Sequence, residues 1–590
     1  MKKVMKAMML TAMIAAAQGC SSDDEEWLND WYGTPTEGST GGTTGGVTAG
    51  SGELTTFTVE IDRSSAEPTD AADSYYPDEE DILANNTFAK EVTITFNGSS
   101  ADCGSADGVT ITSSGAHVVA DHGSTTGVHY IVKGTTTAGS LTIVGSKKYE
   151  VELSGADITN PDSTALNLLS KKRAFLVMAT GTTNRLADGS STKDSDQKAA
   201  LYCKGKLLVN GSGLLEVSGS YNNGIHSADY IVFNSGNNVY VKSIANHGIK
   251  ANDGIFVNGG IINVEVSAAA AKGINCESNI IVNGGRTTVI TTGDGTYDTD
   301  DKEVKASAAI KADSPYTQNG GTVCLKSTGS GGKGLKADYE GYIKGGQLYV
   351  ITEGSQYKYG NDDASPKGIK VGTKNVHGVI TISGGTTLVR TRGSGGEGIE
   401  SKGTLDISDG KVQVSAYDDA VNSAGNMTIS GGDIVAVGTS NDGLDANGNM
   451  YVKGGNIVAF GTSGAETGID VGEQYKLYIT GGNIFGIGGR IDATLGSTTQ
   501  GIVSTSGSVT ANSTVTVSDG NTTLATFTMP PYSYNNGTIM LSTPAMASGS
   551  TYTISLGGSA TTATASSTIS SSMGGGSQPG GNGGGRPGGW

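Results

Sequence analysis

Residues 248–251 read Gly248-Ile249-Lys250-Ala251, and this tetrapeptide occurs along the chain in ten variants. The variants begin at residues 224, 248, 273, 309, 334, 368, 398, 420, 443 and 468. Most intervals are 22 to 25 residues long, and three longer ones hold insertions. Such a period indicates a repeat architecture, in which one unit buries its apolar face only against its neighbours.

Each repeat also has a glycine corner flanked by alternating apolar residues. Gly284-Gly285 and Gly481-Gly482 are two of these corners, and glycine suits a corner that needs positive φ. Met427 and Ile429 precede one corner, and alternation with period two indicates strands with one buried face. A repeat this short leaves no room for crossover helices, so we predict an all-β parallel β-helix.

The repeat fixes which residues face inward. The second position of the tetrapeptide forms an aliphatic stack: Ile225, Ile249, Ile274, Ile310, Leu335, Ile369, Ile399, Val421, Leu444 and Ile469. The fourth position forms a stack of mostly small residues that begins at Cys203 and includes Cys276. These two cysteines lie three repeats apart, about 14 Å at the usual strand spacing. A disulfide needs Cα atoms within about 7 Å, so we predict that they do not pair.

The composition and net charge exclude some classes of function. The 590 residues include 93 glycines and carry a net charge of −18, which argues against nucleic-acid binding because that needs a basic surface. Acidic surfaces often hold calcium. We expect a monomer.

Residues 1–20 have a basic start and a short apolar core, as in a signal peptide. They end Ala17-Gln18-Gly19-Cys20, which resembles a bacterial lipobox, and the acidic residues 21–26 resemble the export tag of Bacteroides-type surface lipoproteins. We therefore expect lipid attachment at Cys20, contact with the membrane through that lipid alone, and a place at the outer membrane or cell surface. An ordinary signal peptide with a chance cysteine is the alternative.

The remaining chain divides by composition into five segments. We predict a flexible tether at 21–52, an N-terminal cap at 53–92, the parallel β-helix at 93–495, a C-terminal β cap at 496–572 and a disordered glycine-rich tail at 573–590. In the C-terminal cap, Val509 to Val517, Thr523 to Met529 and Thr551 to Leu556 alternate as antiparallel strands.

Four stretches resemble a known family: residues 172–176, 181–184, 207–213 and 221–227. They are similar to the carbohydrate-binding parallel β-helix domain family of Bacteroides and clostridial surface proteins, over about residues 90 to 560. The resemblance implies a right-handed, pectate-lyase-like β-helix that binds polysaccharide, often of acidic sugars with calcium. Residues 418–424 and 441–447 lack the histidine that is common in the family's repeats.

The third position of the tetrapeptide is predicted to face solvent. Read along the chain it gives His226, Lys250, Asn275, Lys311, Lys336, Lys370, Glu400, Asn422, Asp445 and Asp470. The position before the glycine gives Lys272, Lys333 and Lys367, then Glu397, Asp419 and Asp442. Stacked lysines repel one another, and a uronic-acid polymer would relieve this. A merely solvated face is the alternative.

Two further groups are candidate sites. Asp418, Asp419, Asp442, Asp445 and Asp470 offer oxygen ligands for Ca²⁺, unless they simply form turns. Insertions at 293–307, 354–366 and about 372–377 carry Tyr297, Tyr357 and Tyr359, which we expect to stack on sugar rings unless these loops are decoration.

Three functions remain open: a noncatalytic polysaccharide binder, which we favour, a polysaccharide lyase or hydrolase, and a structural adhesin. A lyase needs a base, for which Lys311, Lys336 or Lys370 are candidates, with Arg390 or Arg392 as electrophilic help. The sequence singles out none of them, and it contains no recognisable nucleophile–base pair, so no catalytic residue is assigned.

Overall fold

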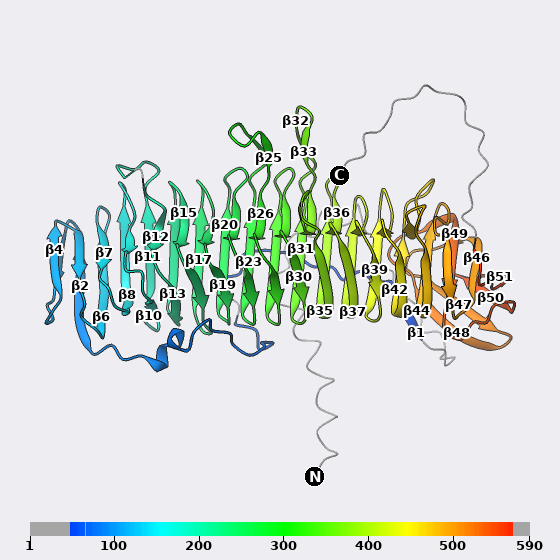
Figure 1. The fold of residues 1–590 in the computed structure, drawn as a ribbon, viewed down its shortest axis with the longest axis horizontal. Coiled ribbons are helices and arrows are strands. Elements are labelled where there is room, and N and C mark those ends of the chain that lie inside the picture. Colours follow the sequence, from blue (N-terminus) through cyan, green and yellow to red (C-terminus); the bar gives the residue numbers. More distant parts are fainter. Residues whose placement is uncertain (1–47, 65, 195, 570–590) are drawn as a thin grey trace, which may run out of the picture.

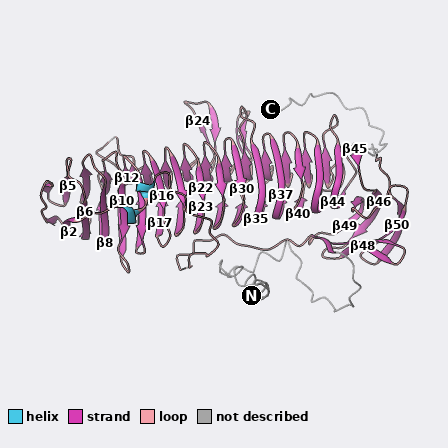
Figure 2. Cartoon of the chain, turned by 60° about the horizontal axis from the view of Figure 1, so that its bottom comes forward, coloured by secondary structure: helices cyan, strands magenta, loops and turns pink. Residues whose placement is uncertain are grey.

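The computed structural model describes residues 48–64, 66–194 and 196–569, and it is built almost wholly of strands. Two short 3-10 helices, η1 (Glu79–Asp81) and η2 (Leu83–Asn85), interrupt them (Figure 2). The strands stack side by side into a long rod (Figure 1). The all-β prediction is confirmed. Among these residues no helix is long and apolar enough to cross a membrane.

Each repeat contributes three strands, and each strand pairs in parallel with its equivalent in the next repeat. β15 (Asn223–Ser227) pairs with β18 (Ile249–Ala251), β16 (Tyr230–Phe233) with β19 (Gly254–Val257), and β17 (Asn238–Ser243) with β20 (Ile261–Val266). Three ladders therefore run along the rod, and their strands are parallel except in antiparallel pairs at its two ends.

The first ladder is a 15-stranded sheet: β4 (Thr110–Ser114), β5 (His117–Asp121), β7 (Ser140–Val144), β9 (Leu166–Leu168), β12 (Ala199–Cys203), β15, β18, β21 (Lys272–Cys276), β26 (Ala308–Ala312), β29 (Lys333–Ala337), β34 (Lys367–Val371), β36 (Glu397–Ser401), β38 (Val421–Ser423), β41 (Leu444–Ala446) and β43 (Ile469–Val471). The second contains β3 (Ser100–Cys103), β2 (Lys90–Asn97), β6 (Val128–Thr136), β8 (Tyr149–Asn160), β10 (Ala174–Met178), β13 (Leu207–Gly211), β16, β19, β22 (Ile280–Val282), β27 (Tyr316–Gln318), β30 (Glu340–Ile343), β35 (Val379–Thr391), β37 (Thr404–Ala416), β39 (Met427–Ile429), β42 (Met450–Phe460), β44 (Leu477–Gly488) and β45 (Leu495–Thr498). The third contains β11 (Thr183–Asp188), β14 (Leu214–Gly219), β17, β20, β23 (Arg286–Thr291), β28 (Thr322–Ser327), β31 (Gln347–Thr352), β40 (Asp433–Gly438), β49 (Tyr534–Ser542) and β46 (Ile502–Val509). The long strands β8, β35, β37, β42 and β44 turn a corner and belong to both the second and the third ladder.

The predicted inward register is confirmed. All ten aliphatic residues of the second tetrapeptide position pair in sequence order, from Ile225 with Ile249 to Leu444 with Ile469, and all are buried. Cys203 and Cys276 are buried and unpaired, as predicted. Cys203 does not start its stack, however, because it pairs with Leu168 of the preceding strand.

The N-terminal end of the rod differs from the prediction. Residues 53–64 and 66–88 do not cap the first repeat; the hairpins β2–β3 and β4–β5 lie there instead, and of the predicted cap only residues 90–92 belong to them. Residues 52–64 and 66–88, which we call the strap, run along the side of the rod, visible in blue in Figure 1. The Thr55 amide donates to Gln413 of β37, and Asp81 accepts from Arg173, just before β10, and from Tyr230 of β16.

The C-terminal end carries a five-stranded sheet in the order β1 (Thr48–Ser51), β48 (Thr522–Thr528), β47 (Thr514–Asp519), β50 (Thr551–Leu556) and β51 (Ser559–Thr564). Its antiparallel pairs agree with the predicted strands, except that Val509 to Val517 divides between β46 and β47. β1 lies within the predicted flexible tether, which is therefore wrong for residues 48–51. The signal peptide, Cys20 and the tail at 573–590 lie outside the described residues.

Steric crowding explains why the first position of the tetrapeptide is mostly glycine. A Cβ on Gly334 would lie 2.1 Å from Val350 Cγ1 and 2.6 Å from the Gly368 carbonyl oxygen of the next repeat. The carbonyl belongs to the paired backbone and cannot withdraw. At the corners the reason is instead conformational, since Gly285 and Gly482 have φ values of 74° and 88°.

We predict that Gly334→Ala destabilises the rod by about 1 to 3 kcal/mol, the usual cost of overpacking. Urea unfolding followed by circular dichroism measures this. Gly486→Ala is the matched control, because its Cβ would meet nothing closer than 3.5 Å. Equal effects of the two substitutions would contradict the steric explanation.

Candidate functional site

The charged face consists of the outward side chains of the 15-stranded sheet. The ten residues of the third tetrapeptide position, from His226 to Asp470, pair in register from strand to strand. Lys272, Ala308, Lys333, Lys367 and Glu397 form a second row beside them. The first predicted row therefore exists as a physical row of neighbours, and the second exists from Lys272 to Glu397, with neighbours one strand spacing apart, about 4.8 Å.

The prediction that the first row faces solvent is wrong for three of its members. His226, Asn275 and Glu400 are each less than a tenth exposed. His226 Nε2 forms a hydrogen bond with Asn252 Oδ1 at 3.2 Å, and the ring makes an edge contact with Tyr202. Burial lowers the pKa of His226 to about 4, so this histidine is neutral near pH 7.

Most lysines of the face are neutralised by carboxylates that the sequence reasoning missed. Lys250 pairs with Glu277 at 2.7 Å, and Lys311 and Lys336 share Asp338 at 3.3 Å. The signal was present in the sequence. Glu277, Asp313 and Asp338 each stand two positions after a residue of the first row, and so form a third row of opposite charge.

The two signs meet at Glu400. Its carboxylate lies 2.6 Å from Lys402, 3.0 Å from Lys370 and 3.8 Å from Lys367, while Lys367 also pairs with Glu397 at 2.7 Å. Burial raises the pKa of Glu400, but the lysine charges outweigh it and hold that pKa at about 2. This cluster is a buried ion network in which each charge depends on the others.

Lys272 and Lys333 differ from these lysines. Their Nζ atoms donate to the backbone carbonyls of Ala270 and Gly331, and within the described residues neither forms an ion pair. Burial and the neighbouring lysines lower the pKa of Lys272 to about 8, and the same causes hold that of Lys333 well below its ordinary value. Lys333 nevertheless keeps contact with solvent. Among the described residues, both amines therefore donate hydrogen bonds but have no carboxylate partner.

The acidic end is held partly by its own backbone. Asp419 accepts from the Asp442 amide at 3.1 Å, and Asp442 accepts from the Thr467 amide at 2.6 Å, so each links two repeats. Burial, then repulsion between neighbouring carboxylates for most of them, raises the pKa of Asp419 to about 7, those of Asp442 and Asp445 to about 8, and that of Asp470 to about 6. In the part of the chain that the structure describes, Asp418 and these four do not form a group of three with ligand atoms within 4.8 Å of one another.

Two hairpins project from the rod at the edge of the charged face (Figure 1). They are β24 (Thr296–Asp298) with β25 (Glu303–Lys305), and β32 (Tyr357–Tyr359) with β33 (Asp362–Ala364). The rings of Tyr297 and Tyr359 stack on each other at 4.2 Å, and Tyr357 lies against Gly295. These tyrosines thus join the hairpins, and Tyr359 keeps the largest free surface, at 52% exposed.

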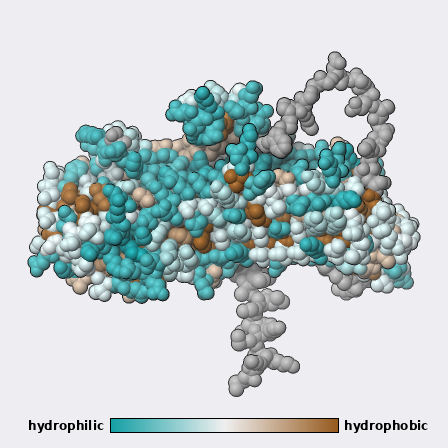
Figure 3. Space-filling model, viewed as in Figure 1, coloured by the Kyte–Doolittle hydropathy of each residue, from teal (hydrophilic) through white to brown (hydrophobic). Residues whose placement is uncertain are grey.

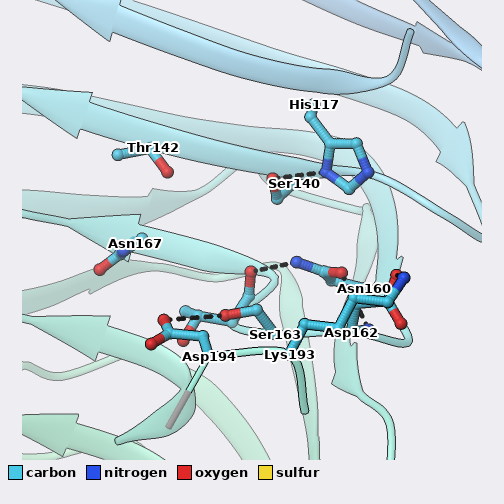
Figure 4. A pocket seen from close by; sticks show the side chains of 10 residues that line it. His117, Ser140, Thr142, Asn160, Asp162, Ser163, Asn167, Lys193 and Asp194 are labelled. Carbon is cyan, nitrogen blue, oxygen red and sulfur yellow. Dashed lines mark hydrogen bonds and ion pairs between the residues drawn. The ribbon is translucent and has the colours of Figure 1, made fainter. Parts of the chain in front are cut away.

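A polar pocket of about 360 Å³ continues the charged face toward the N-terminal end. Figure 4 shows His117 bonded to Ser140 on one side and Ser163 bonded to Asp194 on the other. Thr142 and Asn167 extend the outward row into this pocket. The surface of the two hairpins is largely hydrophilic (Figure 3). The pocket, which the sequence did not predict, is therefore a mixed polar and charged surface, with an ion pair between Lys193 and Asp162 at 2.6 Å.

Comparison with known proteins gives the family. Residues 105–272 and 238–443, together more than half of the chain, match the family described as "Carbohydrate-binding domain-containing protein". The chain belongs to this family. The matched region holds the pocket, the lysines and the hairpins.

Two further similarities are partial. A carbohydrate-binding domain-containing protein of Acetivibrio thermocellus is 27% identical over 121 residues, 19% of this chain and 42% of that protein, so the chain spans less than half of this relative's length. A solved polysaccharide lyase-like protein from C. thermocellum, a gadolinium derivative, is 19% identical with a TM-score of 0.33, covering 48% of this chain and 98% of that one.

We predict that Glu400→Gln destabilises the protein by about 3 kcal/mol, because it leaves buried lysine charges uncompensated. Glu277→Gln removes the more exposed pair with Lys250 and should cost less than about 1 kcal/mol. Chemical denaturation of both variants measures the difference. A Glu400 variant as stable as the Glu277 variant would show that the network contributes nothing.

We also predict that stability falls as pH rises from about 6.5 to 8. The folded carboxyls of Asp419, Asp442 and Asp445 release their protons with pKa values of about 7, 8 and 8, whereas unfolded ones release them near 3.9. The folded state thus binds more protons in this window. His226, with a folded pKa of about 4, acts oppositely but only below its unfolded value near 6.5. Melting temperatures across this range test the prediction, and Asp445→Asn should flatten the slope.

Proposed function

We propose that this protein is a noncatalytic cell-surface binder of acidic polysaccharide, and that its rod is a right-handed parallel β-helix. Three parallel ladders joined by short corners support the fold, and parallel connections of this kind are right-handed in about 98% of cases. Membership of a carbohydrate-binding domain family supports the ligand class.

The single observation that supports an acidic ligand is that the amines of Lys272 and Lys333 have no carboxylate partner among the described residues. Each has its amine near other lysines and bonded only to a backbone carbonyl among the described contacts. A carboxylate of a uronic-acid chain would supply the missing anion and would raise the pKa of both amines toward its ordinary value. The paired lysines, Lys250, Lys311, Lys336, Lys367 and Lys370, would then form the charged face around the ligand rather than bind it through free amines.

One observation favours a second function, a polysaccharide lyase. An amine whose pKa lies well below its ordinary value is available as a proton acceptor, and Lys333 meets this condition while keeping contact with solvent. Lys333 was not among the base candidates named from the sequence. A base at this position would act on a sugar held beneath the hairpins.

We expect the double variant Lys272→Gln/Lys333→Gln to bind polygalacturonate or alginate at least about tenfold more weakly, since a charged hydrogen bond is worth about 1.5 to 3 kcal/mol. Affinity electrophoresis on a panel of acidic and neutral glycans measures this. Lys242→Gln/Lys326→Gln, on the third ladder, is the matched control.

Incubating the wild-type protein with the same glycans distinguishes a binder from a lyase and from an adhesin. Ultraviolet absorbance of an unsaturated product would show elimination and would contradict a purely binding role. Retardation by no glycan would contradict carbohydrate binding and favour an adhesin.

The proposal includes Ca²⁺ at the acidic end. The raised pKa values of Asp442 and Asp445 mean that a nearby cation would relieve their repulsion. The oxygens would have to converge around the ion, as flexible calcium sites allow. We expect glycan binding at pH 8 to weaken in chelator and to recover with added calcium, and Asp445→Asn/Asp470→Asn to abolish that dependence.

The proposal also includes a lipid anchor at Cys20, followed by the acidic residues 21–26. Metabolic labelling with a radioactive fatty acid tests it. Label should enter the full chain and should be lost in Cys20→Ala. Protease added to intact cells should then degrade the wild-type protein.

A further inference from the structure

A histidine and two glutamates meet on the second ladder, away from the charged face. His129 lies on β6, and Glu150 and Glu152 lie on β8, its parallel neighbour. His129 pairs in register with Glu150, and Glu152 is two residues further along the same side of its strand. The three side chains therefore project outward together, from strands of two successive repeats, and their ligand atoms lie within 4.8 Å of one another.

The contacts inside this cluster do not fit hydrogen bonds. His129 Nε2 lies 3.6 Å from Glu150 Oε1 and 3.4 Å from Glu152 Oε2, beyond the usual 2.7 to 3.2 Å for N–H···O. The Nε2 atom is shielded from solvent and forms no hydrogen bond. A buried ring nitrogen without a partner is costly, so a group between the three side chains is to be expected.

The distances fit a tetrahedral metal ion instead. Zn²⁺ binds histidine nitrogen at about 2.0 to 2.1 Å and carboxylate oxygen at about 2.0 to 2.2 Å. Two such ligands at the tetrahedral angle lie about 3.4 Å apart, close to both measured distances. The arrangement provides three ligands, and solvent would fill the fourth position because the side chains are 13%, 16% and 28% exposed.

Neighbouring side chains enclose the cluster on two sides. Glu150 pairs in register with Phe175, whose buried ring contacts Phe88 at the end of the strap, 5.3 Å between centroids. Glu91 occupies the other side of His129 on β2. The apolar ring on one side limits water around Glu150, and burial raises the pKa of Glu150, with the His129 charge opposing it.

We propose that His129, Glu150 and Glu152 form a zinc site that links β6 to β8 at the N-terminal end of the rod. The ion would tie two successive repeats together beside the point where the strap joins β2. A nitrogen ligand favours zinc over calcium, which prefers an all-oxygen shell. This site is thus chemically separate from the acidic end, where only carboxylates are available, and its test is independent of glycan binding.

Untagged full-length mature protein, stripped with chelator, should bind one Zn²⁺ per chain in competition with a chromogenic chelator at pH 7.5. Its melting temperature should rise with zinc and not with the same concentration of calcium, since a ligand of the folded state stabilises it. His129→Gln should lose the bound zinc and the rise in melting temperature. Glu152→Gln, the most exposed ligand, should weaken binding by at least about tenfold, because even outer partners of a metal ligand are worth that much.

His117→Gln is the matched control, since His117 lies in the neighbouring hairpin and bonds to Ser140 instead of carboxylates. It should leave zinc binding unchanged. Absence of zinc binding by the wild-type chain, or equal binding by wild type and His129→Gln, would overturn the proposal and leave His129 as an ordinary ion-pair partner of the two glutamates. If His129→Gln does not fold by circular dichroism, undiminished binding by Glu152→Gln overturns it equally.

Discussion

Backbone pairing between equivalent strands of successive repeats is the constraint on which the rest of the structure depends. It places each residue beside its counterpart one repeat later, as Ile249 lies beside Ile274 and Lys336 beside Lys370. For apolar residues this repetition is favourable, because like side chains stack into a continuous interior. For charged residues it is not, since the same spacing brings like charges within about 5 Å.

The charged face shows how this conflict is resolved. A row of acids follows the row of lysines two positions later, so that Asp338 serves both Lys311 and Lys336. Where the rows exchange sign, Glu400 is surrounded by three lysines. Compensation is incomplete at Lys272 and Lys333 and at the acidic end, and these are the places where an external ion or a charged sugar has most to contribute.

The inward register could be read from the sequence because it depends only on period and residue type. The partners of the outward side chains were harder to predict from the sequence. The repeat places Lys250 beside its neighbours in the row, and the two-position spacing marks Glu277 as part of a row of acids, but Glu277 lies beyond the strand end, so the spacing alone does not show which lysine it contacts. Tyr297 and Tyr359 belong to separate insertions, so only the structure brings their rings together. The strap escaped prediction because residues 53–88 carry no repeat and take their hydrogen bonds from distant partners such as Gln413 and Asn258.

The strap also sets an order of events during synthesis. β1 is among the first described residues to leave the ribosome, yet it pairs with β48, more than 470 positions later. The repeats can assemble one after another as they emerge, and the strap can settle on them, while β1 must wait until β48 exists. Closing a loop of that length is slow. An unfinished chain would therefore hold a folded rod with β1 unpaired, and pairing of β1 would mark the completed molecule.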